Sequence, residues 1–171
     1  MKDITPTEID KIIGIIQHSP LLNIGHFSDK GEVLTFKLSD FCQSNNYEYE
    51  IGCTTKKYFE QIEDKYKLIE GCRVRDFHLD RKSYMFYGKF YDYIFVSCDV
   101  PESEQELFFQ KSYRAIKNAG LILIFIRKNQ RKQISVWSEL LEKNYFVATN
   151  TIELDENWSV IISKKMHGWG G

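Results

Sequence analysis

The chain has 171 residues, of which 27% are charged and 15% aromatic, and its formal net charge is −1. This length suffices for one domain with a sizeable core, and the near-neutral charge provides no general attraction to nucleic acid or to an anionic membrane. No apolar run approaches the length of a membrane span, and the polar start at Met1 carries no apolar signal segment, so we expect a cytoplasmic protein without a membrane partner.

The four cysteines are widely spaced, at Cys42, Cys53, Cys72 and Cys98. They form no CxxC pair and no cluster with histidine, so the sequence predicts neither a zinc site nor a redox pair and favours reduced thiols. No repeat, low-complexity tract or linker divides the chain. We therefore expect a single domain over 1–171, with a leading helix over 1–18 and a tail over 164–171.

The first half of the chain alternates between helical and strand patterns. Thr5–Pro6 has the composition of a helix start, and isoleucines at helical spacing predict a helix that ends before Ser19–Pro20. A short apolar strand that ends at Gly25 follows. The other elements expected in this half are a helix over 32–42, a strand over 47–53, a helix over 54–66 and a third strand within 68–77.

The clearest pattern lies in the middle of the chain. Two apolar runs, Tyr91–Cys98 and Ala119–Ile126, flank a helical segment that begins near Pro101. Neither run alternates apolar with polar residues, which is typical of strands that are covered on both faces. The connection is long enough to hold a helix and to return in the same direction, so the stretch predicts a βαβ unit at the centre of a parallel sheet.

The last part of the chain predicts a helix around Trp137 and a hairpin with strands over 145–152 and 159–163. The tail that starts at Lys164 contains Trp169, which is costly to expose to water. Because Trp is a common anchor of interfaces, we expect this tail to pack on its own surface or to form a homo-oligomer.

This order of elements resembles the class I S-adenosylmethionine-dependent methyltransferases over nearly the whole chain. Phe90–Val96 is similar to the fourth strand of that family, which commonly begins with an aromatic–Asp pair. Ser112–Leu123 is similar to its following helix, turn and fifth strand, with Asn118–Ala119 where Pro–Gly is usual. The resemblance implies an α/β fold: a doubly wound, mostly parallel seven-stranded sheet with an antiparallel last strand and helices on both faces.

The resemblance also implies where the cofactor S-adenosylmethionine would bind, at the carboxyl ends of the first strands. Asn23 stands where the family has an acid, Gly25 matches its first glycine, and larger residues follow. Cysteine or threonine replaces the acid expected after the second strand, and a thiol or hydroxyl is not a bidentate, charged acceptor. The implied cofactor-binding residues are Asn23, Gly25, His26, Phe27, Ser28, Cys53, Thr54, Cys72, Asp76 and Ser97.

Two residues at strand ends are candidates for catalysis. Asp99 follows the fourth strand, where the family places groups that touch the substrate, and the alternative is that it caps the helix that begins at Pro101. His26 is a candidate general base at the end of the first strand, and the alternative is a hydrogen-bonded loop residue.

Arg127 and Lys128 leave the fifth strand in a basic cluster, where a phosphate or RNA could bind; the alternative is a solvated first turn of the next helix. Asp99, Lys128 and Glu153 loosely resemble the Asp–Lys–Glu set of ribose 2′-O-methyltransferases, in which the lysine deprotonates or polarises a hydroxyl.

These observations support two hypotheses. The first is a methyltransferase that acts on a small-molecule, RNA or protein acceptor. The second is a catalytically degenerate relative that serves as an interaction or scaffold protein, which the replaced acids and the bulky residues after Gly25 favour.

Overall fold

The computed structural model describes residues 4–79 and 88–166, which contain one seven-stranded sheet in the order β3-β2-β1-β4-β5-β7-β6. Strand β7 is antiparallel to β5 and β6, and the other pairings are parallel. The predicted mostly parallel sheet with an antiparallel last strand is confirmed. The strands are β1 Asn23–Ser28, β2 Glu48–Cys53, β3 Cys72–Asp76, β4 Tyr91–Val96, β5 Ile116–Arg127, β6 Phe146–Glu153 and β7 Trp158–Lys165.

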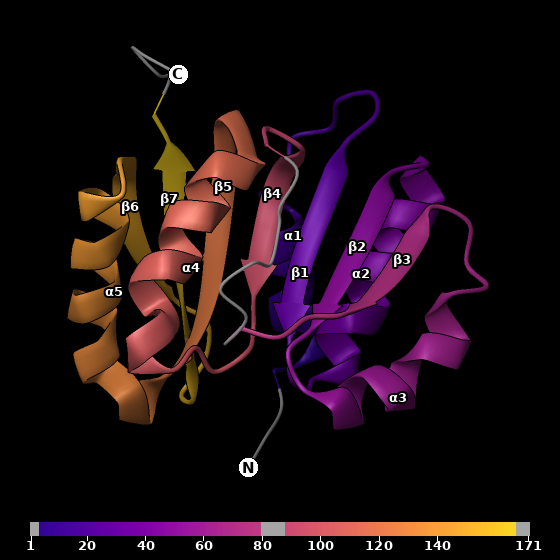
Figure 1. Ribbon diagram of the computed structural model, residues 1–171, viewed down its shortest axis with the longest axis horizontal. Helices are drawn as coiled ribbons and strands as arrows, with labels where there is room; N and C mark the ends of the chain where they lie inside the picture. The colour runs from indigo at the N-terminus through magenta and orange to yellow at the C-terminus, as the bar shows by residue number, and fades with distance from the viewer. Residues whose placement is uncertain (1–3, 80–87, 167–171) are drawn as a thin grey trace.

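Helices cover both faces of the sheet and enclose two apolar cores. Buried residues of the first three helices form one core with β1 and β2, and those of the last two form the other with β4 and β5. In Figure 1, α4 and α5 lie in front of the sheet, and α1 and α2 lie behind it. The helices are α1 Pro6–Ile13, α2 Glu32–Asn45, α3 Lys56–Tyr66, α4 Glu102–Ala115 and α5 Arg131–Lys143, with a short 3₁₀ helix η1 over Lys128–Gln130.

The predicted βαβ unit forms the centre of the sheet. β4 pairs in parallel with β1 on one side and with β5 on the other. Ile94 in β4 and Ile122 in β5 pair with each other, and both are fully buried. The continuous apolar runs thus arise because each central strand is covered by helices on both faces.

β5 begins earlier than the sequence suggests. The turn that the family resemblance places at Asn118–Ala119 lies within β5, because α4 ends at Ala115 and Ile116 already pairs with Tyr91. The register then shifts through a bulge, in which Ala119 has a φ of 66°. Polar residues therefore occupy the start of a central strand, where local composition indicates a turn.

β1 also differs from its prediction, because it starts at Asn23 and continues to Ser28 instead of ending at Gly25. It is hydrogen-bonded to β2 through all six residues and to β4 through four of them. The missing side chain of Gly25 makes room for Tyr91, whose ring atoms lie 3.0 Å from the place that a Cβ would take.

The two ends of the chain also differ from expectation. The first helix ends at Ile13, and Gly14 caps it, whereas the sequence predicts a helix up to His18. The last strand extends to Lys165, so the tail is shorter than predicted. Trp169 lies outside the described residues, and no helix among those that are described is long and apolar enough to cross a membrane.

Candidate functional site

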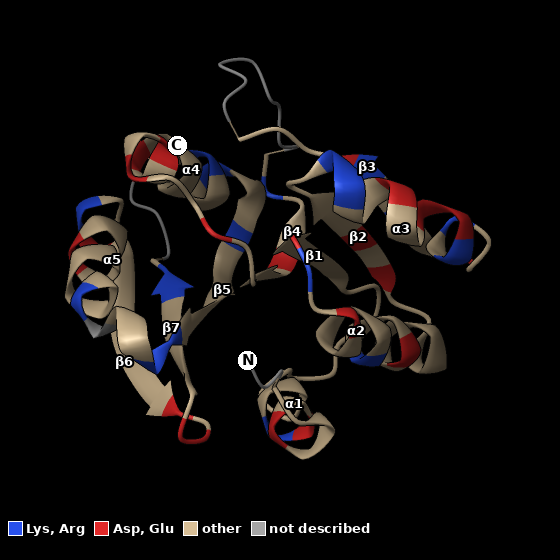
Figure 2. Ribbon diagram, turned by 90° about the horizontal axis from the view of Figure 1, so that it is seen from below, with Lys and Arg blue, Asp and Glu red and all other residues tan. Residues whose placement is uncertain are grey.

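The carboxyl ends of the parallel strands meet at one edge of the sheet, and Figure 2 looks onto that edge. The chain leaves β1 towards β2 and β3, and leaves β4 towards β5 on the opposite side. The winding therefore reverses between β1 and β4, and open α/β sheets bind their ligands in the crevice at such a point.

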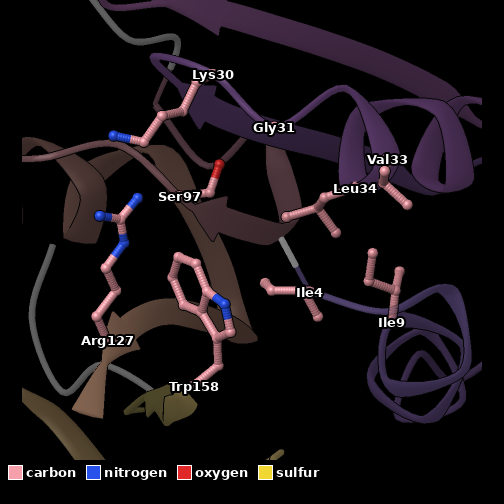
Figure 3. Close-up of a pocket in the computed structure, with 9 residues that line it drawn as sticks. All are labelled: Ile4, Ile9, Lys30, Gly31, Val33, Leu34, Ser97, Arg127 and Trp158. Carbon is pink, nitrogen blue, oxygen red and sulfur yellow. The ribbon is translucent and has the colours of Figure 1, made fainter. Parts of the chain in front are cut away.

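A pocket lies at this edge, and its empty volume of about 400 Å³ is partly open to solvent. Side chains from the start of the chain, the turn after β1, helix α2 and the ends of β4, β5 and β7 line it (Figure 3). Apolar side chains form most of its lining. The lining residues are Ile4, Ile9, Lys30, Gly31, Val33, Leu34, Ser97, Arg127 and Trp158.

Two cations, Lys30 and Arg127, reach towards the same space at the mouth of the pocket (Figure 3). The Lys30 ammonium lies 3.6 Å from Asp29 Oδ1 and 3.9 Å from Asp99 Oδ2. The guanidinium carbon of Arg127 lies 5.2 Å from the centre of the Trp158 ring, within range of a cation–π interaction.

A second hollow of about 530 Å³, partly open to solvent, adjoins the first and shares Arg127 and Trp158 with it. Lys128 also lines it, and its ammonium is 2.8 Å from Glu153. Of the predicted Asp–Lys–Glu set, the structure thus brings Lys128 and Glu153 into contact, and it places Asp99 beside Lys30 instead.

The turn between β1 and α2 consists of Asp29, Lys30 and Gly31. Gly31 has a φ of 94°, which favours glycine, and a Cβ there would meet nothing within 4 Å. Asp29 Oδ2 accepts a hydrogen bond of 3.1 Å from the backbone N–H of Asp99 and so ties this turn to the turn after β4. Its other oxygen, Oδ1, is buried and accepts no hydrogen bond within the described part of the chain.

His26 is completely buried beneath the pocket. Its Nδ1 lies 2.8 Å from the hydroxyl of Tyr49, and its Nε2 lies 2.8 Å from Ser97 Oγ. Ser97 in turn donates to Ser28 Oγ at 3.0 Å, and Ser28 donates to the carbonyl of Lys30. Burial lowers the pKa of His26 to about 3, so the imidazole is neutral at physiological pH.

These donors and acceptors fix the direction of the chain of hydrogen bonds. Because Ser97 gives its proton to Ser28, it accepts from the Nε2–H of His26, and Nδ1 accepts from Tyr49. One lone pair of the Ser97 Oγ atom then remains to accept a hydrogen bond from a donor group of a ligand. His26 is part of β1, so it is not a loop residue, and it does not line the pocket.

The ends of β2 and β3 lie next to the turn after β1. Cys53 is fully buried, and burial raises the pKa of its thiol to about 12, so it is a neutral group. Thr54 donates from its backbone N–H to the carbonyl of Ser28 at 2.9 Å. Asp76 ends β3 at this edge, and its carboxylate is 3.0 Å from Nε2 of His78.

Several predicted cofactor residues are not at this edge. Asn23 starts β1 and Cys72 starts β3, so both lie at the amino ends of their strands, on the opposite side of the sheet. Gly25 packs against Tyr91 inside the sheet. Phe27 points into the second core, where its ring centre is 4.9 Å from that of Phe77. These four residues therefore lie away from the pocket, because β1 continues to Ser28 instead of ending at Gly25 and Cys72 is the first residue of β3.

The structure also adds residues that sequence reasoning missed, namely Asp29, Gly31, Trp158 and Ile4. The glycine directly before the helical pattern of α2 was a usable signal for the ligand-facing turn. Nothing in the local sequence marks Trp158 or Ile4, because they reach the pocket only through the pairing of β7 with β5 and the packing of α1.

The fold is that of the class I S-adenosylmethionine-dependent methyltransferases. An S-adenosylmethionine-dependent O-methyltransferase from Thermotoga maritima matches with a TM-score of 0.73 and 15% identity over 100% of this chain and 69% of its own length. A TehB-like methyltransferase from Corynebacterium glutamicum matches with a TM-score of 0.67 and 13% identity, over 96% of this chain and 89% of its own.

Phosphoethanolamine N-methyltransferase 2 from Haemonchus contortus, solved with S-adenosyl-L-methionine, matches with a TM-score of 0.69 and 10% identity over 94% of this chain. The chain spans 52% of the length of that enzyme, and also 52% of the CurJ carbon methyltransferase and of the CMeT domain of the citrinin polyketide synthase, which it matches as well. No family model and no curated protein matches the sequence. These similarities define the fold.

Proposed function

We propose that the protein is an S-adenosylmethionine-dependent methyltransferase whose methyl donor binds between the turn after β1 and the end of β4. The observation that carries the proposal is the pocket at the point where the winding reverses, with Gly31 on one side and Ser97 on the other. A cleft at this position is where a doubly wound sheet exposes backbone groups to a ligand.

The side chains at the pocket fit the donor. S-adenosylmethionine carries an ammonium and two ribose hydroxyls, which are hydrogen-bond donors. Beside the pocket, the buried Oδ1 of Asp29 is an acceptor that lies 3.6 Å from the Lys30 ammonium and receives no hydrogen bond from the described residues. The remaining lone pair of Ser97 offers a second acceptor. Asp29 therefore replaces, from the neighbouring strand, the carboxylate that is missing at Cys53. The adenine end of the donor would lie next to Thr54 and Asp76, at the carboxyl ends of β2 and β3.

When bound, S-adenosylmethionine supplies an electrophilic methyl group for direct displacement. The task of the protein is to align the acceptor with that methyl group and to exclude water, because orientation alone supplies much of the rate enhancement in such reactions. The apolar floor excludes water, and Arg127 with Trp158 positions the acceptor.

His26 and Asp99 take indirect roles in this proposal. His26 orients the hydroxyl of Ser97 from below, and Asp99 holds the turn after β1 through its backbone N–H and the ammonium of Lys30. Both are positioning residues, since neither lines the pocket.

Calorimetric titration with S-adenosylmethionine and S-adenosylhomocysteine tests the donor site. We expect both to bind to the wild type and Val33→Trp to abolish binding, because Val33 lines the pocket on α2 and a larger ring fills it. Phe36→Trp is the matched control, since Phe36 is on the same helix and is 53% exposed. If the wild type gives no heat of binding at millimolar ligand, the methyltransferase hypothesis is refuted, and the hypothesis of a catalytically degenerate interaction protein remains.

A further inference from the structure

We propose that Ser28 is a positioning residue for the methyl donor: it fixes the direction of the Ser97 proton, so that Ser97 accepts a hydrogen bond from the amino group of the donor. This inference rests on the proposed function and adds the residue that decides which ligand group Ser97 can bind. It starts from the chain of hydrogen bonds beneath the pocket, in which Ser28 is completely buried and does not itself line the pocket.

The hydroxyl of Ser28 can only accept a hydrogen bond from Ser97. A serine hydroxyl has one proton and two lone pairs. Ser28 donates its proton to the carbonyl oxygen of Lys30, in the turn that follows β1. Ser97 Oγ lies 3.0 Å from Ser28 Oγ and donates to it, and the second lone pair of Ser28 is available to the neighbouring hydroxyl of Tyr58. Ser28 therefore directs the Ser97 proton away from the pocket.

The second buried partner of Ser97 is a hydrogen-bond donor. Nε2 of His26 lies 2.8 Å from Ser97 Oγ, and Nδ1 lies 2.8 Å from the hydroxyl of Tyr49. Burial raises the pKa of Tyr49, so its hydroxyl keeps the proton and donates it to Nδ1. The proton of the neutral imidazole is then on Nε2 and is given to one lone pair of Ser97. Only the other lone pair of Ser97 faces a ligand, so Ser97 can accept there but cannot donate.

The ligand group that meets this lone pair is the amino group of the methyl donor. Asp29, Thr54 and Asp76 do not line the pocket, and the proposed function places the ribose and the adenine beside them. The pocket, which has Ser97 on its wall next to Lys30 (Figure 3), then holds the methionine part. At neutral pH the ammonium is the one hydrogen-bond donor of that part, and hydrogen bonds from charged donors are strong.

Calorimetry with two matched ligands tests the proposal: S-adenosylhomocysteine and its deaminated analogue, in which a hydrogen atom replaces the amino group. We expect the wild type to bind S-adenosylhomocysteine about tenfold more tightly than the analogue. In Ser28→Ala the Ser97 proton loses its acceptor and can turn into the pocket. The preference should then fall below about threefold, while the affinity for the analogue stays unchanged.

Ser112→Ala is the matched control, because Ser112 is a completely buried serine on α4 whose Oγ forms no hydrogen bond with the described residues. It should keep the tenfold preference. A loss of packing alone would weaken both ligands together, so the ratio of the two affinities measures the direction of the Ser97 proton and not the integrity of the fold.

A double variant tests the direction of the hydrogen bonds a second time. Tyr49→Phe, made in the Ser28→Ala protein, removes the donor that holds His26 in its tautomer. The imidazole can then carry its proton on Nδ1 and accept the Ser97 proton at Nε2, so a lone pair of Ser97 faces the pocket again. We expect the preference to recover to at least about fivefold.

The possible failures are distinguishable. A wild type that binds both ligands equally overturns the proposal, and so does a Ser28→Ala protein that keeps the full preference, whether or not both affinities fall. A double variant that stays at the reduced preference overturns the assigned direction of the chain. If neither ligand binds to the wild type up to about 10 mM, it is the proposed methyltransferase function that fails.

Discussion

The Nε2 atom of His26 lies 2.8 Å from the hydroxyl of Ser97, at the centre of the sheet and beneath its ligand-facing edge. This contact joins β1 to the residue after β4 across the point where the winding of the sheet reverses. A neutral imidazole is the group that can both accept from Tyr49 and donate to Ser97. The orientation of the pocket hydroxyl therefore depends on a side chain that no ligand can reach.

Protonation of His26 should destabilise the fold as the pH falls. Burial lowers its pKa from 6.5 to about 3, so between these values the unfolded chain binds a proton that the folded chain does not. The contribution of the neutral histidine is complete above about pH 6.5 and is lost as the pH falls towards 3, by about 3 kcal/mol at pH 4. Urea unfolding at pH 7 and pH 4 measures it. The free energy of unfolding of His26→Gln should fall by about 3 kcal/mol less than that of the wild type, and equal losses would contradict the prediction.

Asp29→Asn should weaken the binding of the methyl donor without unfolding the protein. The amide oxygen of the asparagine can still accept a hydrogen bond from the backbone N–H of Asp99. The amide NH₂ then takes the place of Oδ1, and because it is a donor it cannot accept a hydrogen bond from the ligand. We expect a loss of about 1.5–3 kcal/mol in the binding of S-adenosylhomocysteine, measured by calorimetry. Asp64→Asn, at an exposed carboxylate on α3, is the control and should bind as the wild type does. An unchanged affinity in Asp29→Asn would show that groups other than Asp29 bind the methyl donor.

Gly120→Ala should destabilise the junction of α4 and β5. A Cβ at this position would lie 2.5 Å from Ile116 Cγ2 and 2.7 Å from the carbonyl oxygen of Asp92, so the bulge would have to shift. Overpacking of this kind costs about 1–3 kcal/mol in the free energy of unfolding. Gly88→Ala is the comparison, because the nearest atom, the carbonyl oxygen of Arg114, is 3.9 Å away. Thermal denaturation of both variants checks the difference, and similar melting temperatures would show that the bulge adapts freely.

Lys165→Met should lower stability more than Lys164→Met, its neighbour on β7. Lys165 is buried, and its ammonium donates to the carbonyls of Tyr113 and Ile116 at 2.7 and 2.8 Å, where α4 meets β5. Methionine keeps the apolar stem and leaves two carbonyls without that donor, at a cost of about 2–4 kcal/mol. Lys164 is exposed, so the same change there should alter the free energy of unfolding by less than about 0.5 kcal/mol. Equal effects in urea unfolding would contradict the predicted role of Lys165.

The architecture was largely predictable because it depends on residue type along the chain. The apolar runs of β4 and β5 indicate strands covered on both faces, and the isoleucines of α1 indicate one buried face. The predicted order of elements gives the observed sheet, with β3 at its edge. Such patterns survive in any sequence that must bury an apolar stripe, whatever its function.

The candidate site was predicted less well because a shift of a few residues in a strand end moves a side chain from one edge of the sheet to the other. Asn23 was expected at the ligand edge but is the first residue of β1, whereas Asp76, from the same set of implied residues, ends β3 at that edge. Composition could not locate the end of β1, since His26 and Ser28 look like loop residues until their buried partners are known.

The sequence by itself determined the class of fold: which segments are helices or strands, and which central strands are buried on both faces. Only the tertiary structure decided what the carboxyl edge contains. It brought Lys30, Ser97, Arg127 and Trp158 to one pocket from four separate parts of the chain. It also placed His26 inside the sheet and the carboxylate of Asp29 at its edge. The physical reason is that apolar periodicity is a local property, whereas the partners of a polar side chain depend on the register of strands that are distant in sequence.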